Sequence, residues 1–332
     1  MKAIILAGGS GKRFWPMSQK SFPKQFIKLF NDKSMIQLTV ERLLHIFTMD
    51  DIFIVTVADQ VELITHQIPD INLKNIIVEP FGMNTAPCIA LSIVYISNVG
   101  HDNEELLILP ADHYIPQTEE FVKYIKSGLE ASKKNILITF GVQPTYPATG
   151  FGYIELGDEY SDLMFHVKHF KEKPNLQLAN TFLKTGNYFW NSGMFCWNLK
   201  TIIEAFNTFE PEMLRIAEEV VKNNNNEIYN KMTKKSIDIA IMEKAKNVVV
   251  LPVDYKWSDV GNWRSFSDLM LKDGNNNYFK DIHLSFNSKN NCIFSNKKVA
   301  IIGVENLIVV ETDDALLIVK NDSCETVKEI NF

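Results

Sequence analysis

The first half of the chain alternates between short apolar runs and longer segments in which apolar residues recur at helical spacing. The apolar runs predict strands at Ala3–Leu6, Ile52–Val57, Asn75–Val78, Leu106–Leu109 and Ile136–Gly141. The helically spaced segments predict helices at Ser34–Phe47, Asp59–Gln67, Thr85–Ser97 and Phe121–Ser132. Because strands and helices alternate at this spacing, we expect an α/β fold with a Rossmann-like, doubly wound and mainly parallel sheet.

The pattern changes between Gly150 and about Pro252. Strands that look antiparallel are expected there, mixed with helices, at Tyr153–Leu156, Phe165–Lys171, Phe189–Trp197, Asn175–Thr185 and Leu199–Phe206. We interpret this region as an insertion that covers the ligand edge of the sheet and holds a second substrate. The asparagine run Asn223–Asn226 is interpreted as a solvated turn.

A third pattern begins after Gly274–Asn277, where a change of composition indicates a linker. Short strands are predicted beyond it, followed by a closing helix, at Val299–Ile302, Leu307–Val310, Leu316–Val319 and Cys324–Ile330. We therefore divide the chain into residues 1–273 and a small β-domain, 274–332, whose turn spacing is compatible with a β-helical form. Its strand edges are unprotected, so we expect this domain to pair with a second copy as a homodimer.

Composition excludes some classes of protein. With 332 residues, 46% of them hydrophobic, the chain has material for a large core, and its net charge of −6 argues against a nucleic-acid partner. The four cysteines are scattered, which favours a reducing compartment. The apolar run after Lys2 is too short for a signal peptide and no stretch is long enough to cross a bilayer, so we expect no membrane contact and a cytoplasmic location.

The strand Ala3–Leu6 ends in the glycine-rich stretch Gly8–Gly11, with Lys12, Arg13 and Lys24 close behind it in sequence. Glycines let backbone amides converge on an anion, and the basic residues add positive charge, so the loop suits phosphates. Glycines after a strand are also common in simple tight turns. The loop lacks the Gly-Lys-Ser/Thr of a Walker A motif, and Trp15-Pro16 stands where the helix of a dinucleotide fingerprint would continue.

Two other strands are followed by equally suggestive stretches, Glu79–Asn84 and Pro110–His113. In doubly wound sheets, ligands bind outside the carboxyl ends of the strands. Three such stretches at strand ends therefore predict one ligand site along that edge.

These residues also carry a family resemblance that extends over nearly the whole chain. The motifs are L-A-G-G-S-G-K-R-F-W-P with P-K-Q, then N-T-A-P at Asn84–Pro87, P-A-D-H at Pro110–His113, G-F-G-Y-I at Gly150–Ile154, F-K-E-K-P at Phe170–Pro174, W-N-S-G-M-F at Trp190–Phe195 and W-S-D-V-G-N-W at Trp257–Trp263. In this order they resemble the sugar-1-phosphate nucleotidyltransferases, and specifically their mannose-1-phosphate guanylyltransferase branch.

The resemblance implies a nucleotide site in which Arg13 binds the triphosphate and Lys24 reaches the α-phosphate. It assigns the remaining nucleotide contacts to Leu6, Ala7, Gly8, Gly9, Ser10, Gly11, Glu79, Pro80, Asn84, Thr85, Pro110 and Ala111. Glu79 is expected to accept hydrogen bonds from the N1–H and N2–H₂ groups of guanine.

The resemblance also places a metal ion on Asp112 and Asp259. Either aspartate alone would more often be a cap or turn residue, but phosphate-bound Mg²⁺ commonly takes one or two carboxylates and fills its remaining positions with water and phosphate oxygens. We therefore expect Mg²⁺ as cofactor and Arg13, Lys24, Asp112 and Asp259 as the catalytic set.

For the sugar phosphate, the resemblance assigns Gly152, Tyr153, Glu172, Lys173, Asn191 and Gly193. Glu172 would accept hydrogen bonds from hydroxyls and Lys173 would hold the phosphate. Lys171 departs from the apolar residue that relatives often carry, which affects the local packing rather than the chemistry.

The implied partners are GTP and mannose 1-phosphate, joined to give GDP-mannose and diphosphate. One alternative is the same transfer with another pair, such as a GDP-heptose, dTDP-glucose or UDP-sugar. A second is a non-catalytic nucleotide-sugar sensor, against which the intact basic and acidic residues argue. A nicotinamide dehydrogenase is disfavoured by the basic loop and by Trp15-Pro16.

Overall fold

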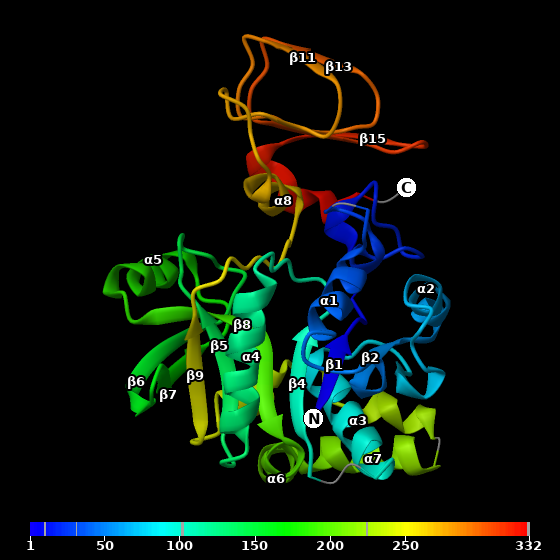
Figure 1. Cartoon of the computed structure of the whole chain (residues 1–332), viewed down its shortest axis with the longest axis vertical. Helices are drawn as coiled ribbons and strands as arrows, with labels where there is room; N and C mark the ends of the chain where they lie inside the picture. Colours follow the sequence, from blue (N-terminus) through cyan, green and yellow to red (C-terminus); the bar gives the residue numbers. More distant parts are fainter. Residues whose placement is uncertain (10, 31, 101–102, 224, 331–332) are drawn as a thin grey trace. The chain divides into compact units, whose positions relative to one another are not determined.

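The computed structural model describes residues 1–9, 11–30, 32–100, 103–223 and 225–330. The chain forms two compact units, shown together in Figure 1. The first unit comprises residues 1–8, 37–111 and 115–257, and the second comprises 9–36, 112–114 and 258–332. The second unit thus takes in an early stretch of the chain as well as its end.

The first unit is built on a nine-stranded mixed sheet of order β3-β2-β1-β4-β8-β5-β9-β7-β6. Its strands are β1 Lys2–Leu6, β2 Ile52–Val57, β3 Ile76–Glu79, β4 Glu105–Pro110, β5 Leu137–Val142, β6 Tyr153–Ser161, β7 Met164–Lys171, β8 Tyr188–Asn198 and β9 Val248–Val253. The strands β3, β2, β1 and β4 are all parallel, as the alternating pattern predicts.

The region after Gly150 extends this sheet instead of covering its ligand edge, which corrects our expectation. β8 lies between β4 and β5 and is antiparallel to both, while β9 runs parallel to β5. The burial of β8 explains its central place, because Trp190, Met194, Cys196 and Trp197 are all nearly inaccessible to solvent. A strand that is apolar on both faces is stable only between two others that are themselves covered.

Helices cover both faces of the sheet. The helices of the first unit are α1 Met35–Leu43, which begins in the second unit, α2 Val61–Gln67, α3 Thr85–Asn98, α4 Thr118–Ser132, α5 Leu176–Thr185, α6 Leu199–Phe209 and α7 Pro211–Asn223. Ile4 of β1 and Ile108 of β4 belong to one core cluster with α3, α6 and α7. On the other face, α4 packs so closely that a Cβ on Gly128 would lie 2.8 Å from Phe140 Cζ.

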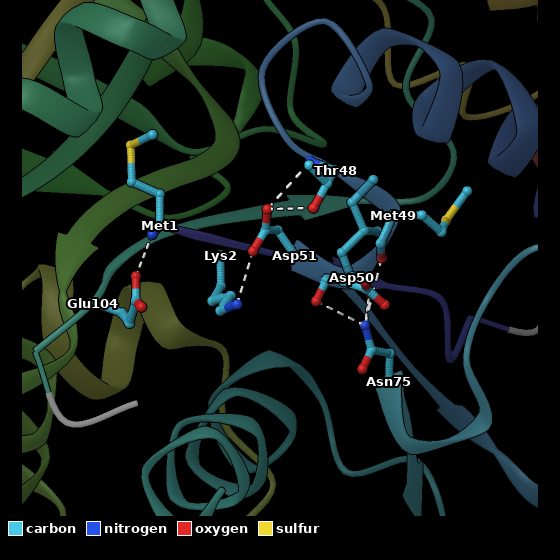
Figure 2. Close-up of polar contacts among 9 residues, drawn as sticks. Met1, Lys2, Thr48, Met49, Asp50, Asp51, Asn75 and Glu104 are labelled. Atoms are coloured by element: carbon cyan, nitrogen blue, oxygen red, sulfur yellow. Dashed lines mark hydrogen bonds and ion pairs between the residues drawn. The ribbon is translucent and has the colours of Figure 1, made fainter. Parts of the chain in front are cut away.

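Ion pairs and hydrogen bonds fix the amino-terminal ends of the parallel strands (Figure 2). Lys2 Nζ of β1 pairs with Asp51 Oδ1 at 2.8 Å, and the amino group of Met1 pairs with Glu104 just before β4. Asn75 Nδ2 donates to the carbonyl of Ile52 at 3.0 Å. These polar contacts lie at the end of the strands opposite to the glycine-rich stretch.

The second unit contains a small coiled β-structure. Its strands are β10 Tyr278–Phe279, β11 His283–Phe286, β12 Cys292–Phe294, β13 Val299–Ile302, β14 Leu307–Glu311 and β15 Leu316–Lys320. β10, β12 and β14 are parallel neighbours, as are β11 and β13, so the chain returns to the same two sheets at each turn. Asn277 Oδ1 accepts the amide of Asn291 at 3.0 Å, and Asn291 Oδ1 accepts the amide of Leu307 at 3.0 Å, which stacks successive corners.

The same unit includes the 3₁₀ turns η1 Lys12–Phe14 and η2 Lys24–Phe26, the helix α8 Trp263–Leu269 and the 3₁₀ segment η8 Asn321–Glu329. η8 stands where we expected a closing helix. In the part of the chain that the structure describes, no helix combines the length and the apolar character needed to cross a membrane.

Candidate active site

Backbone hydrogen bonds between neighbouring strands fix the carboxyl edge of the first unit's sheet. Beyond β1, the amide of Ala7 donates to the carbonyl of Val55 at 2.8 Å. Beyond β4, the amide of Ala111 donates to the carbonyl of Leu6 at 3.0 Å, and Leu6 is in register with Pro110. Of the residues expected at the nucleotide, the structure therefore brings Leu6, Ala7, Pro110 and Ala111 together.

Glu79 ends β3 and is almost fully buried. Its Oε1 accepts hydrogen bonds from the Tyr229 hydroxyl at 2.6 Å and the Met83 amide at 3.2 Å. Its Oε2 lies 3.5 Å from the position that a Cβ on Gly8 would occupy. Burial raises the pKa of Glu79, although both hydrogen bonds act in the opposite direction. The carboxylate is thus fixed beside Gly8, and Pro80 follows it in the chain.

The Asn84–Pro87 motif forms the start of α3 and holds a distant segment. Asn84 has a φ of 82° and its side chain caps the helix through the amide of Thr85. The hydroxyl of Thr85 accepts the amide of Ile237 at 2.8 Å, and the amide of Ala86 donates to the carbonyl of Lys235 at 3.2 Å. Thr85, expected at the nucleotide, is thus used to dock residues 235–237.

In the second unit, the glycine-rich loop packs tightly at Gly11 and openly at Gly9. Gly11 has a φ of 56°, and a Cβ there would lie 2.4 Å from the backbone nitrogen of Lys24. A Cβ on Gly9 would meet no described atom within 4 Å, while the Gly9 carbonyl accepts Gln25 Nε2 at 3.1 Å. Ser10, also expected at the nucleotide, lies outside the described residues.

Lys24 is the buried centre of this unit's polar cluster. Its Nζ pairs with Asp112 Oδ2 at 2.8 Å and donates to the carbonyls of Asp259 at 2.6 Å and Val260 at 2.8 Å. These three acceptors match the three N–H bonds of an ammonium group. In this arrangement, Lys24 can reach a phosphate only by exchanging one acceptor.

The two expected metal ligands lie in segments that an isolated β-bridge joins. Tyr114 and Ser258 exchange backbone hydrogen bonds at 2.9 and 3.1 Å, and Lys24 contacts the carboxylate of Asp112 and the backbone carbonyl of Asp259. Burial acts to raise the pKa of Asp112, but the charges of Lys24 and His113 outweigh it and the pKa is lowered. Burial raises the pKa of Asp259, with Asp112 adding to the effect and Lys24 opposing it.

Two carboxylates are a chemically suitable but incomplete set for a hard divalent cation. Among the described residues, no group of three or more His, Cys, Asp and Glu side chains is arranged to hold a metal. Mg²⁺ prefers oxygen ligands and keeps several waters or phosphate oxygens, so Asp112 and Asp259 fit the part of its coordination that a protein usually supplies.

The loop that carries Asp259 is strained and supported from several sides. Val260 has a φ of 44°, a conformation that β-branched residues rarely adopt. A Cβ on Gly261 would lie 2.8 Å from Asp259 Oδ2. Trp263, fully buried, donates from Nε1 to the carbonyl of Trp15 at 2.9 Å. Strain of this kind persists only where surrounding contacts enforce it, and Lys24 supplies two of them.

Arg13 lies at the surface of the second unit. Its Nε is 3.5 Å from Glu325 Oε2 of η8, and Glu325 also accepts a hydrogen bond from Asn262. About half of the Arg13 side chain is exposed, so it is accessible to an anionic ligand.

The expected sugar residues lie in the first unit. Glu172 pairs with Lys173 Nζ at 2.7 Å, and its Oε2 lies 2.9 Å from where a Cβ on Gly152 would stand. Asn191 Oδ1 accepts the amide of Gly193 at 3.2 Å. Gly152, Glu172 and Asn191 therefore converge, since a Gly152 Cβ would also lie 3.4 Å from Asn191 Cβ.

Tyr153 differs from the other expected sugar residues because its side chain is fully buried. Its ring packs against Phe182 with centroids 5.3 Å apart. The structure therefore gives this side chain a place in the core.

Asp238 is a residue of this cluster that sequence reasoning missed. It begins the π-helical segment η7 Asp238–Met242, and its Oδ1 accepts Asn191 Nδ2 at 2.8 Å. Burial, with the charge of Glu172 next in effect, raises the pKa of Asp238 to about 7. In the surrounding sequence S-I-D-I-A, Asp238 looks like an ordinary aspartate at the start of a helix, and nothing marks it as a residue of a binding site.

Comparison with known proteins agrees with this arrangement. A family model described as nucleotidyl transferase matches residues 2–276. The chain belongs to this family. A second model, described as the MannoseP isomerase/GMP-like beta-helix domain, matches residues 281–331, where the coiled β-structure lies.

Relatives within the nucleotidyl transferase family extend the likeness to nearly the full chain. The chain is 35% identical over 345 residues to an Escherichia coli mannose-1-phosphate guanylyltransferase, covering 98% of this chain and 74% of that protein. It is 35% identical to the xanthan biosynthesis protein XanB of Xanthomonas campestris, with 98% and 72% covered. A Thermus thermophilus structure described as a mannose-1-phosphate geranyltransferase superposes with a TM-score of 0.91 at 31% identity, covering 99% and 97%.

The glycine loop yields a first prediction. Gly11→Ala should lower the free energy of unfolding by about 1–3 kcal/mol, because the new Cβ would overlap the Lys24 backbone at a strained φ. Gly9→Ala is the matched control and should unfold like the unsubstituted protein. Urea unfolding of all three proteins measures this, and equal stability of the two variants would contradict the packing at Gly11.

Lys24 yields a second prediction. Lys24→Met should leave Asp112 and two carbonyls without this donor, at about 1–3 kcal/mol for the buried Val260 carbonyl and less for the partly exposed Asp112 carboxylate. We expect a lower melting temperature together with loss of turnover. The exposed Lys20→Met serves as control. A Lys24→Met protein that melts normally but is inactive would show that Lys24 serves the ligand alone.

Proposed function

We propose that the chain catalyses guanylyl transfer from GTP to mannose 1-phosphate, giving GDP-mannose and diphosphate. The observation that carries this proposal is the 35% identity over 98% of the chain to a protein named for that reaction. The cluster of Lys24, Asp112 and Asp259 supports an enzyme over a nucleotide-sugar sensor. A sensor has no need of a buried lysine that holds one carboxylate and the loop of a second.

The reaction proposed is an in-line substitution at the α-phosphorus of GTP. A phosphate oxygen of mannose 1-phosphate forms the new bond to phosphorus, and the bond to the β-phosphate bridging oxygen breaks, so that diphosphate leaves. The attacking oxygen is already an anion, and no general base has to remove a proton. Catalysis then consists of positioning the reactants and neutralising their charge.

We assign charge neutralisation to Arg13 for the departing diphosphate and to Lys173 for the phosphate of the sugar. Lys173 is largely exposed, which supports its access to an anion. Lys24 holds Asp112 and the Asp259 loop in position, and it contacts the α-phosphate if one of its three acceptors is exchanged.

We assign a divalent cation, Mg²⁺, to Asp112 and Asp259. When bound, it would supply positive charge to the phosphate oxygens of the nucleotide. The glycine loop, with Gly8, Gly9 and Ser10, would donate backbone hydrogen bonds to the same phosphates. Glu79 is the acceptor proposed for guanine, since Oε2 faces the glycine side of the strand ends while Oε1 is held by Tyr229.

We place the reaction in the cytoplasm. We also place it in polysaccharide biosynthesis, since the Xanthomonas relative is named a xanthan biosynthesis protein. The four cysteines are buried and unpaired, in keeping with a reducing compartment. We also propose a homodimer formed through the second unit.

A substrate panel tests the proposed reaction. Purified protein with Mg²⁺, GTP and mannose 1-phosphate should release diphosphate, whereas ATP, UTP and dTTP should release little. Glucose 1-phosphate and a heptose 1-phosphate run beside mannose 1-phosphate test the sugar. If folded protein releases diphosphate only with another nucleotide or sugar phosphate, that pair is the substrate pair instead of GTP and mannose 1-phosphate. If no pair gives diphosphate while GDP-mannose binds tightly, the result favours a sensor.

The dimer proposal rests on an exposed apolar face of the second unit. Leu284 and Phe286 of β11 and Ile302 of β13 are 75%, 65% and 71% exposed, and Phe286 is in register with Ile302. Phe286→Lys should convert a dimer to a monomer in light scattering after gel filtration, because an ammonium group would be desolvated at the contact. Leu73→Lys, at a similarly exposed site, should not. A monomeric unsubstituted protein would disprove the dimer.

A further inference from the structure

The cluster around Asn191 contains a carboxylate that has no role in the assignments above. Asp238 accepts the side-chain amide of Asn191 at 2.8 Å, and among the described residues Asn191 is the one side chain that donates to it. A carboxylate has two oxygens and room for several donors. The carboxylate accepts the bond from Asn191 and one from its own backbone amide, which leaves capacity for a further donor.

The orientation of Asn191 toward Asp238 is fixed. Asn191 Oδ1 accepts the Thr139 hydroxyl at 2.8 Å and the Gly193 amide at 3.2 Å. The oxygen therefore faces the sheet and the NH₂ group faces Asp238. Because both ends of the Asn191 side-chain amide are hydrogen-bonded, Asn191 holds the Asp238 carboxylate in a defined position.

Asp238 is held from its own side as well. Residues 235–237 are docked on the start of α3 by two bonds, from Ile237 to Thr85 and from Ala86 to Lys235. Ile237 precedes Asp238 in the sequence, so the Asn84–Pro87 motif positions the Asp238 carboxylate through Ile237. This contact gives the Thr85 hydroxyl a structural role.

The charges around Asp238 do not neutralise it. Glu172 and Glu243 lie close enough to raise its pKa, and Lys173 acts in the opposite direction while paired with Glu172. The amide of Glu172 donates to Glu243 Oε1 at 3.3 Å. Carboxylates gathered without matching cations suit a ligand rich in hydroxyl groups, which donates to each of them.

We propose that Asp238 is a sugar-binding residue that, beside Glu172, hydrogen-bonds one hydroxyl of the hexose, and that Thr85 is its positioning residue. The proposal rests on the proposed function for the identity of the sugar phosphate. It adds to that function a residue, Asp238, that would distinguish hexoses by the positions of their hydroxyl groups.

The test compares Asp238→Ala and Asp238→Asn with Asp158→Asn, a control at an exposed aspartate of β6. Asp238→Ala should raise the KM for mannose 1-phosphate about tenfold or more, with the KM for GTP changed less than about twofold. Asp238→Asn should have a smaller effect, because its Oδ1 can still accept from Asn191. Asp158→Asn should change neither constant.

Monodeoxy analogues of mannose 1-phosphate separate binding from a structural role. If Asp238 binds one hydroxyl, the cost of Asp238→Ala should disappear for the analogue that lacks that hydroxyl and persist for the others. An equal cost for every analogue, or an equal rise in the KM for GTP, would overturn the proposal. If Asp238→Ala does not fold, Asp238→Asn is measured with the same analogues.

Thr85 is tested by Thr85→Val and Thr85→Ser. Thr85→Val removes the hydroxyl that accepts the amide of Ile237, and it should raise the KM for the sugar phosphate. Thr85→Ser keeps a hydroxyl for this amide, and its KM should be close to that of the unsubstituted protein. A rise confined to the KM for GTP would instead make Thr85 a nucleotide residue.

If the unsubstituted protein releases no diphosphate with any pair, calorimetric titration with mannose 1-phosphate decides. Binding that is lost or weakened about tenfold in Asp238→Ala would uphold the inference while the proposed reaction fails. Equal binding by both proteins, or none by either, would overturn the inference.

Discussion

One buried ammonium group organises the acidic part of the candidate site. Lys24 Nζ meets Asp112, the carbonyl of Asp259 and the carbonyl of Val260 at 2.6 to 2.8 Å. A lysine withdrawn from water is stable only when its N–H bonds are matched, and these three acceptors come from two stretches that are far apart in sequence. The same contacts hold Val260 in a conformation that a β-branched residue avoids. Lys24 thus holds the Asp112 carboxylate directly and the Asp259 loop through its backbone.

The cluster of Asn191, Asp238 and Glu172 follows a different physical design. There a neutral amide, Asn191, links the sheet to Asp238, and the carboxylates outnumber the nearby cations. In the acidic cluster of the second unit, two carboxylates face one ammonium group, and the negative charge that Lys24 does not balance suits a cation. The Asn191 cluster is suited to hydroxyl groups, which bring donors but no charge. Under the proposed function, the first chemistry would serve the nucleotide phosphates and the second the sugar hydroxyls.

Sequence alone predicted the parallel strands, because buried strands that alternate with amphipathic helices leave a periodic pattern. It also singled out Lys24, Asp112, Glu172 and Asn191 from motifs, whose exact roles remain proposals. It did not predict that β8 would lie between β4 and β5, because strand order depends on long-range pairing that periodicity does not encode. Asp238 and Tyr229 were missed, since each acts through a partner more than forty residues away in the chain.

The second unit is built from two distant stretches of the chain, and this limits which segments can be exchanged between related proteins. Residues 9–36 belong to this unit together with the C-terminal residues, through contacts such as Trp263 to Trp15 and Glu325 to Arg13. A chimaera joined at Gly274–Asn277 would take its coiled β-structure and η8 from one parent and its glycine loop from the other. The two stretches would then no longer be adapted to each other. Recombination within this family should therefore succeed more often when these two stretches are inherited as a pair, although more than two hundred residues separate them in the gene.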